Sequence, residues 1–390
     1  MKLLLKTLTA LLLFLGILVL LLYAFNYQYI LKGIKVTYFS GHTTAHIEDF
    51  TEFDNRKIEK AEAPEPWAKH SQYNRIPPSE NLRDLNKKYG TIAFLIIKND
   101  SIWFENYAET FGPDSQTNSF SMAKSIVAAL LGKAIKDGYI ESMEQPVSDF
   151  LPQFNEDLKI GDLASMASGL NWEEEYYSPF SMTARAYFDE NLRDQILALK
   201  ITGIPGKEFE YLSGNTQLLA MVIEKATGQT LSDYLSESFW KPMGMENDAL
   251  WQLDSQDSGM EKAYCCIASN ARDFAKMGKL YKNFGKWNGK QILDSSFVAR
   301  SIRPRFDDYP HYGYGFWLEK FNGKDLFYLR GIHGQYTIVI PEDDLIIVRL
   351  GHSTSGREEG KEHPEDLYQY LQEVYLMMAQ ETKGHIGTLP

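Results

Sequence analysis

Residues 120–139 read FSMAKSIVAALLGKAIKDGY, and their apolar spacing predicts a helix that begins at Ser121 and ends near Gly138. The apolar face of this helix carries Ile126, Val127, Leu130, Leu131 and Ile135. Its first turn places Ser121 and Lys124 on one face, three positions apart and within reach of each other. A lysine kept partly neutral by burial can accept the serine proton, and N–H groups at a helix start can stabilise an oxyanion. The stretch therefore predicts both a helix and a candidate nucleophile.

Strand-like segments lie on both sides of this helix in the sequence. Before it, Thr91–Ile97 and Ile102–Tyr107 flank residues 98–101, a pattern typical of a β-hairpin. After residue 312 four more such segments follow: YGYGFWLEK, DLFYLRG, QYTIVIP and LIIVRLGH. Residues 150–300 are mostly helical stretches and long loops, and residues 363–380 predict a closing helix. We expect an α/β protein of α+β arrangement over residues 91–385, with an antiparallel sheet built from both ends, flanking helices and a mostly helical insertion.

The Ser-x-x-Lys spacing alone is a weak signal, because one or two matches are expected by chance in a chain of this composition. A second match, Ser238-Phe-Trp-Lys241, occurs at a helix end beside Pro242. No helix begins there, so we interpret it as a chance match. Ser121 has the better context because it opens an apolar helix directly after a predicted strand pair.

Two further segments combine polar side chains with turn residues. Residues 205–219, PGKEFEYLSGNTQLL, carry Tyr211, Ser213 and Asn215 ahead of a helical pattern. Residues 329–335, LRGIHGQ, lie between two predicted strands and contain Ile332 and His333. Taken singly, a tyrosine is more often a core aromatic and a histidine more often structural.

Taken together and in this order, the three segments resemble the β-lactamase-related serine hydrolases. This penicillin-binding-protein-like family includes class C β-lactamases, D-alanyl-D-alanine peptidases, esterases and 6-aminohexanoate-dimer hydrolase. The resemblance extends from about Leu82 to Met378 and includes VSDFLP at 147–152, MASGLNWEEEY at 166–176 and ARDFAKMG at 271–278. The last two stretches and the SGNTQLL loop are most similar to the 6-aminohexanoate-dimer hydrolase branch.

The resemblance implies a β-lactamase/transpeptidase-like fold and a role for each motif residue. Ser121 would be the acylated nucleophile, Lys124 its activator, and Tyr211 the proton shuttle to the leaving group. The Ile332 N–H would join that of Ser121 as oxyanion donor. Tyr176 falls where the amide-hydrolysing branch places a substrate-contacting tyrosine, with Tyr177 as an equally suitable alternative.

The sequence departs from the family pattern at two positions. Where relatives carry the Asn of a Tyr-x-Asn motif, this chain has Ser213, and Asn215 follows two residues later. Where relatives carry Lys-Thr-Gly or His-x-Gly, it has Gly331-Ile332-His333, and no Lys-Thr-Gly or Lys-Ser-Gly follows Tyr211. Because that lysine and hydroxyl bind the β-lactam carboxylate, we expect poor recognition of penicillins.

The composition of the chain disfavours some classes of partner and cofactor. With 40 Lys and Arg against 52 Asp and Glu, the net charge is −12, which disfavours a nucleic-acid backbone binder. The two cysteines, Cys265 and Cys266, cannot build a zinc site or disulfide framework, and we expect small buried residues that are not bonded to each other. His42 and His46 have a metal-like spacing but show no helical face, so a solvated pair is the favoured reading. We expect no metal and no cofactor.

The N-terminus predicts a membrane anchor over residues 1–25. Residues 8–25 contain no charge, which approaches the roughly 20 residues of a spanning helix. The run is longer than the apolar region of a signal peptide and lacks a clear A-x-A site, although a cleaved signal remains the rival interpretation. Lys2 and Lys6 favour a cytoplasmic N-terminus, and Lys32 and Lys35 weaken that preference. Residues 26–90, polar and proline-rich, would form a juxtamembrane stalk and lead-in.

These features predict a single-pass protein of the cell membrane with its catalytic domain exported to the periplasm or exterior. The expected activity is a serine hydrolase that cleaves a small ester, amide or peptide-like substrate through an acyl-enzyme. The alternative is a catalytically silent, penicillin-binding-like module that binds peptidoglycan or a partner.

Overall fold

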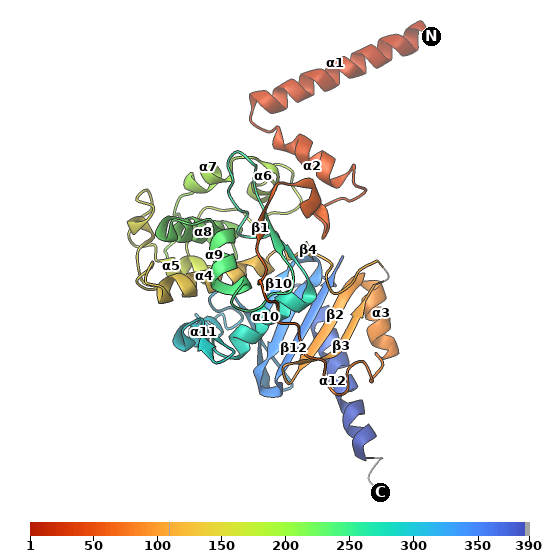
Figure 1. Cartoon of the computed structure of the whole chain (residues 1–390). Helices are drawn as coiled ribbons and strands as arrows, with labels where there is room; N and C mark the ends of the chain where they lie inside the picture. The colour runs from red at the N-terminus through yellow and green to blue at the C-terminus, as the bar shows by residue number, and fades with distance from the viewer. Residues whose placement is uncertain (109, 387–390) are drawn as a thin grey trace.

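The computed structural model describes residues 1–108 and 110–386, with side chains described as far as residue 381. Its main layer is a six-stranded, fully antiparallel sheet of order β3-β2-β12-β11-β10-β9. The strands are β2 (Thr91–Lys98), β3 (Ser101–Tyr107), β9 (Trp317–Phe321), β10 (Lys324–Gly331), β11 (Gln335–Ile340) and β12 (Leu345–Gly351). The predicted sheet of strands from both ends of the domain is confirmed: β2 and β3, orange in Figure 1, lie beside β12, in blue.

The hairpin β2–β3 shows how local sequence sets the register. Lys98 pairs with Ser101, which leaves Asn99 and Asp100 as a two-residue loop. Both loop residues have positive φ, 50° and 55°. Asn and Asp tolerate this backbone region well, and two consecutive positive φ values match the twist of a tight hairpin.

Helices cover both faces of the sheet because alternate strand residues are buried on each side. Leu95 and Ile97 point into the core shared with α4 and α10, whereas Phe94 and Ile96 point toward α12. The sheet-covering helices are α3 (Glu80–Lys88), α4 (Met122–Lys136), α10 (Ala271–Lys282) and α12 (Glu365–Ile386).

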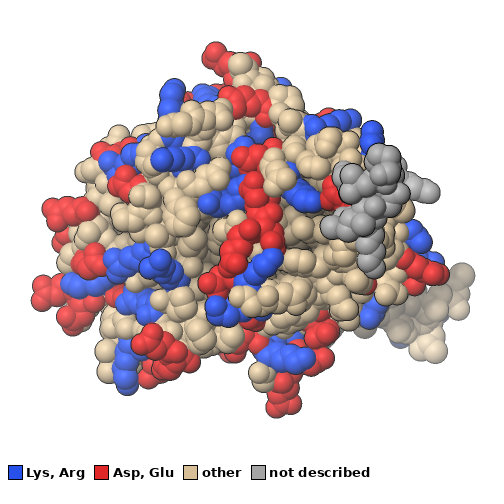
Figure 2. Space-filling model, turned by 90° about the horizontal axis from the view of Figure 1, so that it is seen from below, with Lys and Arg blue, Asp and Glu red and all other residues tan. Residues whose placement is uncertain are grey.

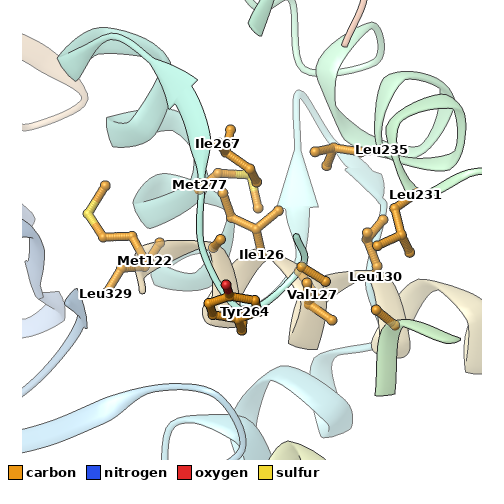
Figure 3. Close-up of a cluster of buried hydrophobic side chains, with 14 of the residues drawn as sticks. Met122, Ile126, Val127, Leu130, Leu231, Leu235, Tyr264, Ile267, Met277 and Leu329 are labelled. Carbon is orange, nitrogen blue, oxygen red and sulfur yellow. The ribbon is translucent and has the colours of Figure 1, made fainter. Parts of the chain in front are cut away.

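Helix α4 differs from the one-sided amphipathic helix that its spacing predicts. It is buried on nearly all sides, because α8 packs on it opposite the sheet. Figure 3 shows Met122, Ile126, Val127 and Leu130 of α4 surrounded by side chains from several other elements. A helix that is apolar all round belongs in a core. Its first residues are therefore held rigidly.

The remaining elements form a helical part and two small sheets. The helices are α5 (Ile160–Ala164), α6 (Met182–Phe188), α7 (Leu192–Leu197), α8 (Ser213–Thr227), α9 (Leu231–Leu235) and α11 (Ser295–Ser301). One sheet has the order β1-β5-β6-β4, formed by Asn55–Ile58, Ala249–Gln252, Ile267–Ser269 and Thr117–Asn118. The other pairs β7 (Lys286–Trp287) with β8 (Lys290–Gln291). Short turns of helix lie at Asp49–Glu52, Val147–Asp149, Ser236–Trp240, Ile332–Gly334 and Pro341–Asp343.

The segment 26–90, predicted as a stalk and lead-in, packs onto the domain along much of its length. Helix α2 (Tyr29–Thr37) contacts α6, and β1 pairs with β5. Val36, Ile47 and Ile58 are fully buried, so apolar residues scattered among polar ones anchor a segment whose average composition is polar. This part of the chain belongs to the folded unit rather than standing apart from it.

Helix α1 (Lys2–Ala24) projects away from the domain with no buried residue (Figure 1). Among the described residues it is the one helix long and apolar enough to cross a membrane, judged by length and composition. The surface seen from below in Figure 2 is of mixed charge, with Lys and Arg side chains interspersed among Asp and Glu.

Candidate active site

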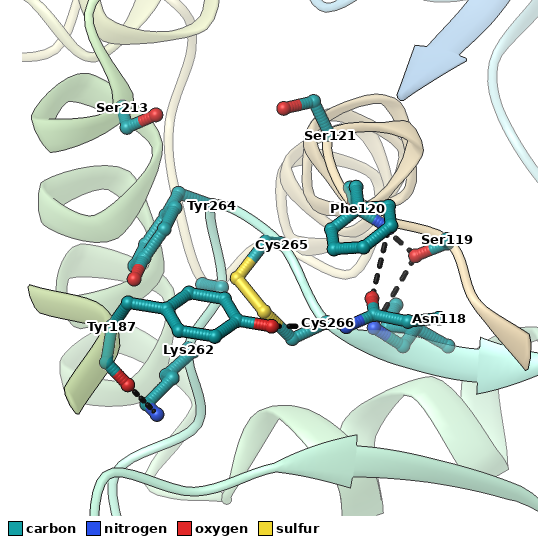
Figure 4. The surroundings of a disulfide bond; sticks show 12 residues. Asn118, Ser119, Phe120, Ser121, Tyr187, Ser213, Lys262, Tyr264, Cys265 and Cys266 are labelled. Carbon is teal, nitrogen blue, oxygen red and sulfur yellow. Dashed lines mark hydrogen bonds between the residues drawn. A yellow bond between two sulfur atoms is a disulfide. The ribbon is translucent and has the colours of Figure 1, made fainter. Parts of the chain in front are cut away.

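Ser121 occupies a rigid turn at the start of α4. The preceding Phe120 has φ 47°, a left-handed conformation that is unusual for an aromatic residue. Neighbouring hydrogen bonds hold this turn: the Phe120 N–H donates to Asn118 Oδ1 at 2.9 Å, and the Ser119 N–H donates to the Ile267 carbonyl at 2.8 Å. The Ser121 side chain makes no helix-capping bond, and Figure 4 shows its hydroxyl directed away from the Asn118–Ser119 turn. Backbone strain of this kind is concentrated at functional sites.

Lys124 is buried beneath the serine. Its Nζ donates to Ser121 Oγ at 3.0 Å and to the Tyr264 carbonyl at 2.7 Å. Burial lowers the pKa of Lys124 to about 8, although the charge of Glu174 partly opposes this effect. A lysine of this pKa is available as an unprotonated base near neutral pH.

Tyr211 lies on the other side of Ser121, just before α8. Burial raises the pKa of the Tyr211 phenol, and hydrogen bonding with Ser121 opposes that rise. The Lys124 Nζ lies 5.1 Å from the centre of the Tyr211 ring. The ring itself packs against Trp317 and Tyr312, with centroid separations of 5.4 and 6.1 Å. Tyr211 therefore remains protonated at neutral pH and can both accept and donate at the serine oxygen.

Glu174 connects the loop before α6 to the start of α8. Its carboxylate accepts from the Ser213 N–H at 2.6 Å, the Ser213 hydroxyl at 2.7 Å and the Trp172 indole at 2.8 Å. It also accepts from the Tyr176 hydroxyl. A carboxylate at a helix N-terminus is favoured by the unpaired N–H groups there. Nothing in the local sequence distinguishes Glu174 from its neighbours Glu173 and Glu175, so this role was not predicted.

The side chains of Tyr176 and Tyr177 have different environments in the structure. Tyr177 is 96% exposed. Tyr176 is 48% exposed, but its hydroxyl is turned inward onto Glu174. Burial of that hydroxyl, together with the charge of Glu174, raises the pKa of Tyr176 well above its ordinary value. Of the two, Tyr176 is therefore the one whose hydroxyl is held at the site.

The turn at residues 331–334 forms the opposite wall. His333 has φ 62°, and its Nε2 lies 2.9 Å from the Ala45 carbonyl. Burial lowers the pKa of His333. A Cβ on Gly331 would lie 2.2 Å from the Ser119 carbonyl, so only glycine allows β10 to approach the turn before Ser121 this closely. Ile332 lines the same cavities as Ser121.

Asn215 is not brought to the site. It is fully buried in α8, and its amide lies 3.6 Å from the Met166 sulfur. It lines neither of the two cavities that contain Ser121. Ser213, by contrast, lines the first of these cavities and faces Ser121 across the gap in Figure 4.

The two cavities share six lining residues: Thr43, Thr44, Ser121, Tyr176, Tyr177 and Ile332. One extends between α2 and α6 and is lined largely by apolar and aromatic residues. The other passes Tyr211 toward β9 and β10 and contains several charged residues. Ser121 thus stands where two spaces of different chemistry meet.

Comparisons with known proteins agree with this arrangement. The model of the β-lactamase family matches residues 79–372. The chain belongs to the β-lactamase family. It is 26% identical over 290 residues to the 6-aminohexanoate-dimer hydrolase of Paenarthrobacter ureafaciens, covering 67% of this chain and 72% of the relative. It is also 27% identical over 144 residues to the D-aminopeptidase of Brucella ovis, covering 35% of this chain and 27% of the relative.

Solved structures share the fold of this β-lactamase-family chain. A Bacillus anthracis protein proposed to be a 6-aminohexanoate-dimer hydrolase superposes with a TM-score of 0.70 at 20% identity, covering 93% of this chain and 95% of that one. A family VIII carboxylesterase superposes with a TM-score of 0.60 at 17% identity, covering 77% and 98%. The predicted resemblance and fold are confirmed, and the chain is a serine hydrolase of the β-lactamase family.

The expectation of two unbonded cysteines is wrong for this β-lactamase-family chain. Cys265 and Cys266 form a disulfide between adjacent residues (Figure 4). The backbone turns sharply here, with φ 78° at Cys266, which brings the two side chains to the same side. The bond directly follows Tyr264, whose carbonyl accepts from Lys124.

Other polar motifs lie away from Ser121. The second Ser-x-x-Lys match is not assembled as a pair: Ser238 is buried, while the Lys241 Nζ lies 2.5 Å from Glu237 and 3.0 Å from Glu59. The His42 and His46 rings stack at 3.8 Å, and His46 also lies 3.5 Å from Glu48.

One group of described residues could hold a metal ion. It consists of Glu319, on β9, and of His311 and His363, whose side chains lie beside it. His363 Nε2 lies 3.1 Å both from His311 Nδ1 and from Glu319, so these side chains already contact one another. None of the three lines a cavity together with Ser121.

Proposed function

We propose that this protein hydrolyses an ester or amide through an acyl-enzyme formed on Ser121. The observation that carries the proposal is the Lys124 side-chain nitrogen, 3.0 Å from Ser121 Oγ, with a pKa lowered by burial to about 8. In its unprotonated form this buried amine is poised to remove the serine proton. The fixed turn at Phe120 presents the hydroxyl to both cavities.

The proposed reaction has two halves. Ser121 Oγ attacks the substrate carbonyl as its proton passes to Lys124, and the resulting oxyanion accepts from the backbone N–H groups of Ser121 and Ile332. Tyr211 then protonates the departing alkoxide or amine and regains a proton from Lys124, the carbonyl–leaving-group bond breaks, and the acyl group remains on Ser121. Water attacks the acyl-enzyme by the same route and releases a carboxylic acid. The three side chains form a coupled proton network rather than a fixed base and acid.

The charges at the site support a neutral or cationic leaving group. Gly331-Ile332-His333 replaces the Lys-Thr-Gly of β-lactam-binding relatives, and burial lowers the pKa of His333, so it offers no positive charge at neutral pH. The Glu174 carboxylate adds negative charge beside Ser213. We propose hydrolysis of short aryl esters, cleavage of small linear amides with an amine terminus, and poor turnover of penicillins and cephalosporins.

We also propose that α1 anchors the protein in the cell membrane. None of its 23 residues is buried, and its length suits a bilayer core. Lys2 and Lys6 support a cytoplasmic N-terminus and an exported domain, periplasmic or extracellular. A cleaved signal peptide is the competing possibility.

A substrate screen with purified protein tests the activity. p-Nitrophenyl acetate, a linear aminoacyl anilide and a chromogenic cephalosporin are compared for the wild type and Ser121→Ala. Ester turnover that depends on Ser121 and exceeds cephalosporin turnover supports the proposal. No turnover of any substrate, combined with binding to peptidoglycan, would instead identify a silent binding module.

A further inference from the structure

The two cavities that meet at Ser121 differ in charge. Among the described residues that line the cavity between α2 and α6, none is charged at neutral pH. The other cavity has both signs on its walls: Glu174, Glu210, Arg330, Arg357 and Glu362. We infer that the substrate is an amphiphile whose aliphatic acyl chain occupies the first cavity and whose polar alcohol or amine occupies the second. This inference rests on the proposed acyl-enzyme at Ser121 and names its substrate class.

Most of the wall of the uncharged cavity is apolar. Three of its hydroxyl groups are occupied within the protein: Tyr29 donates to the Pro179 carbonyl at 3.0 Å, Thr37 to the Gly33 carbonyl at 2.7 Å, and Tyr187 to Asp49 at 2.7 Å. The buried Tyr264 hydroxyl has no partner among the described residues. Such a lining gives an aliphatic chain apolar contact and offers a charged group no partner of opposite charge.

Helix α2 is fitted closely against the opposite wall. A Cβ on Gly33 would lie 3.2 Å from the Phe188 ring of α6, so the absent side chain allows the two helices to approach. Ile30 and Ile34, on α2, and Ala184, on α6, face the space beyond this contact. The packing of α2 against α6 therefore forms the wall of the cavity.

Tyr211 fixes which part of the substrate enters which cavity. It lines the charged cavity and not the uncharged one. The group that protonates the leaving atom must stand on the leaving-group side of the scissile bond. The alcohol or amine therefore lies beside Tyr211 and Arg330, whose guanidinium packs 4.8 Å from the Trp317 ring centre and donates to the Glu362 carbonyl at 3.0 Å. The acyl chain is left with the space beside α2.

The uncharged cavity also lies next to the proposed anchor. Only residues 25–28 separate α1 from α2, and α2 lies between α1 and the body of the domain (Figure 1). Tyr38 and Tyr177, which line this cavity, are exposed aromatic residues of the kind that favours a membrane interface. An amphiphile could reach Ser121 from the bilayer or from water, and both sources share the same acyl chemistry.

A chain-length series tests the inference on the full-length protein, reconstituted in vesicles of ether-linked phosphatidylcholine that contain no hydrolysable ester. With p-nitrophenyl esters from acetyl to octanoyl, kcat/KM should rise about fourfold for each added methylene that enters the cavity. Ala184→Trp, which fills the cavity, should lower the octanoyl-to-acetyl ratio of kcat/KM at least tenfold. Ala299→Trp is the matched control: Ala299, partly buried on α11, lines a cavity remote from Ser121, and its substitution should leave the ratio unchanged.

Ile34→Asp is the second variant, in case the tryptophan disturbs folding. It places a charge at a partly exposed cavity position and should lower the same ratio. A flat chain-length profile in the wild type would contradict the assignment of the uncharged cavity to the acyl chain. An equal octanoyl-to-acetyl ratio of kcat/KM in Ala184→Trp and Ala299→Trp would contradict it as well. In either case, turnover of the acetyl ester would still support the serine mechanism. No turnover of any ester overturns the serine mechanism itself. A palmitoyl ester held in the same vesicles distinguishes the sources: its turnover supports delivery from the bilayer, and turnover of octanoyl ester alone supports a dissolved amphiphile.

Discussion

The Glu174 carboxylate binds Ser213 twice, accepting from its N–H at 2.6 Å and from its hydroxyl at 2.7 Å. Ser213 stands at the position where the family resemblance would place the asparagine of a Tyr-x-Asn motif. In this chain Ser213 binds the Glu174 carboxylate, which in turn accepts a hydrogen bond from the Tyr176 hydroxyl. The negative charge of Glu174 also acts on Lys124, and it raises the pKa of that lysine against the effect of burial.

We expect the activity of the wild type to increase with pH through about 8. Burial lowers the pKa of Lys124 to about 8, and only the unprotonated amine can accept the Ser121 proton. Below that pH, kcat/KM for an aryl ester should fall about tenfold per pH unit as the amine becomes protonated. Initial rates between pH 5.5 and 9.5, corrected for spontaneous hydrolysis, measure the profile.

Glu174→Gln is the matched test of this assignment. The Glu174 charge raises the pKa of Lys124, so its removal should move the ascending limb toward lower pH. Asp157→Asn, on an exposed loop, removes a charge elsewhere and should leave the limb in place. A limb that does not move in Glu174→Gln, or that moves to higher pH, would contradict the electrostatic coupling.

Ser121→Ala should abolish hydrolysis without destabilising the fold. The Ser121 side chain makes no capping bond to α4, so the free energy of unfolding should change by no more than about 0.5 kcal/mol. The rate should fall at least about 1000-fold, as expected for loss of a nucleophile. Thermal unfolding and ester turnover are the two readouts. Ser238→Ala is the control for the second Ser-x-x-Lys match, and loss of activity in that variant with retention in Ser121→Ala would show that the wrong serine was assigned.

Tyr176→Phe should depress amide cleavage far more than ester cleavage. An amine departs poorly unless it is hydrogen-bonded and protonated, whereas a phenoxide departs with less help. The Tyr176 hydroxyl is held on Glu174, and Tyr177 is 96% exposed, so Tyr177→Phe serves as the control. Comparison of kcat/KM for a matched anilide and aryl ester gives the ratio. Equal losses on both substrates in Tyr176→Phe would rule out this role.

The full-length chain should remain with the membrane fraction after a high-salt wash, because α1 would be held by apolar contacts rather than by charge. A chain beginning at Asn26 should be soluble and should retain α2, whose buried side includes Val36. Fractionation followed by N-terminal sequencing measures both properties. A mature N-terminus beyond residue 22 would show that the apolar segment is a cleaved signal peptide.

The sheet was predictable because its strands carry strong local signals. β2, β3, β10, β11 and β12 occur within one residue of their expected bounds, since uninterrupted β-branched and aromatic runs end at turn residues. β9 is the exception, because it begins at Trp317, five residues after the start of its predicted segment. The segment 26–90 was not predictable in this way. Its contacts involve isolated residues such as Val36 and Ile58, which bury against partners far away in sequence and leave no local periodicity.

The residues of the candidate site likewise fall into those that the sequence predicts and those that it does not. Ser121 and Lys124 were identifiable because helical spacing alone places them together, and the family resemblance supplied Tyr211 and Ile332. The Tyr264 carbonyl, which accepts from Lys124, has no sequence signature because any residue has a carbonyl. The Ala45 carbonyl beside His333 is hidden for the same reason, and so is the turn that joins Cys265 to Cys266.

Covalent labelling of the intact protein by a fluorophosphonate tests the central claim most directly. Peptide mass spectrometry after labelling should locate a single adduct on Ser121, formed faster as the pH rises through about 8 and absent from Ser121→Ala. Lys124→Met should greatly slow the labelling because the serine loses its base. An adduct on another serine, or ester hydrolysis by a protein whose Ser121 remains unlabelled, would contradict an acyl-enzyme at Ser121.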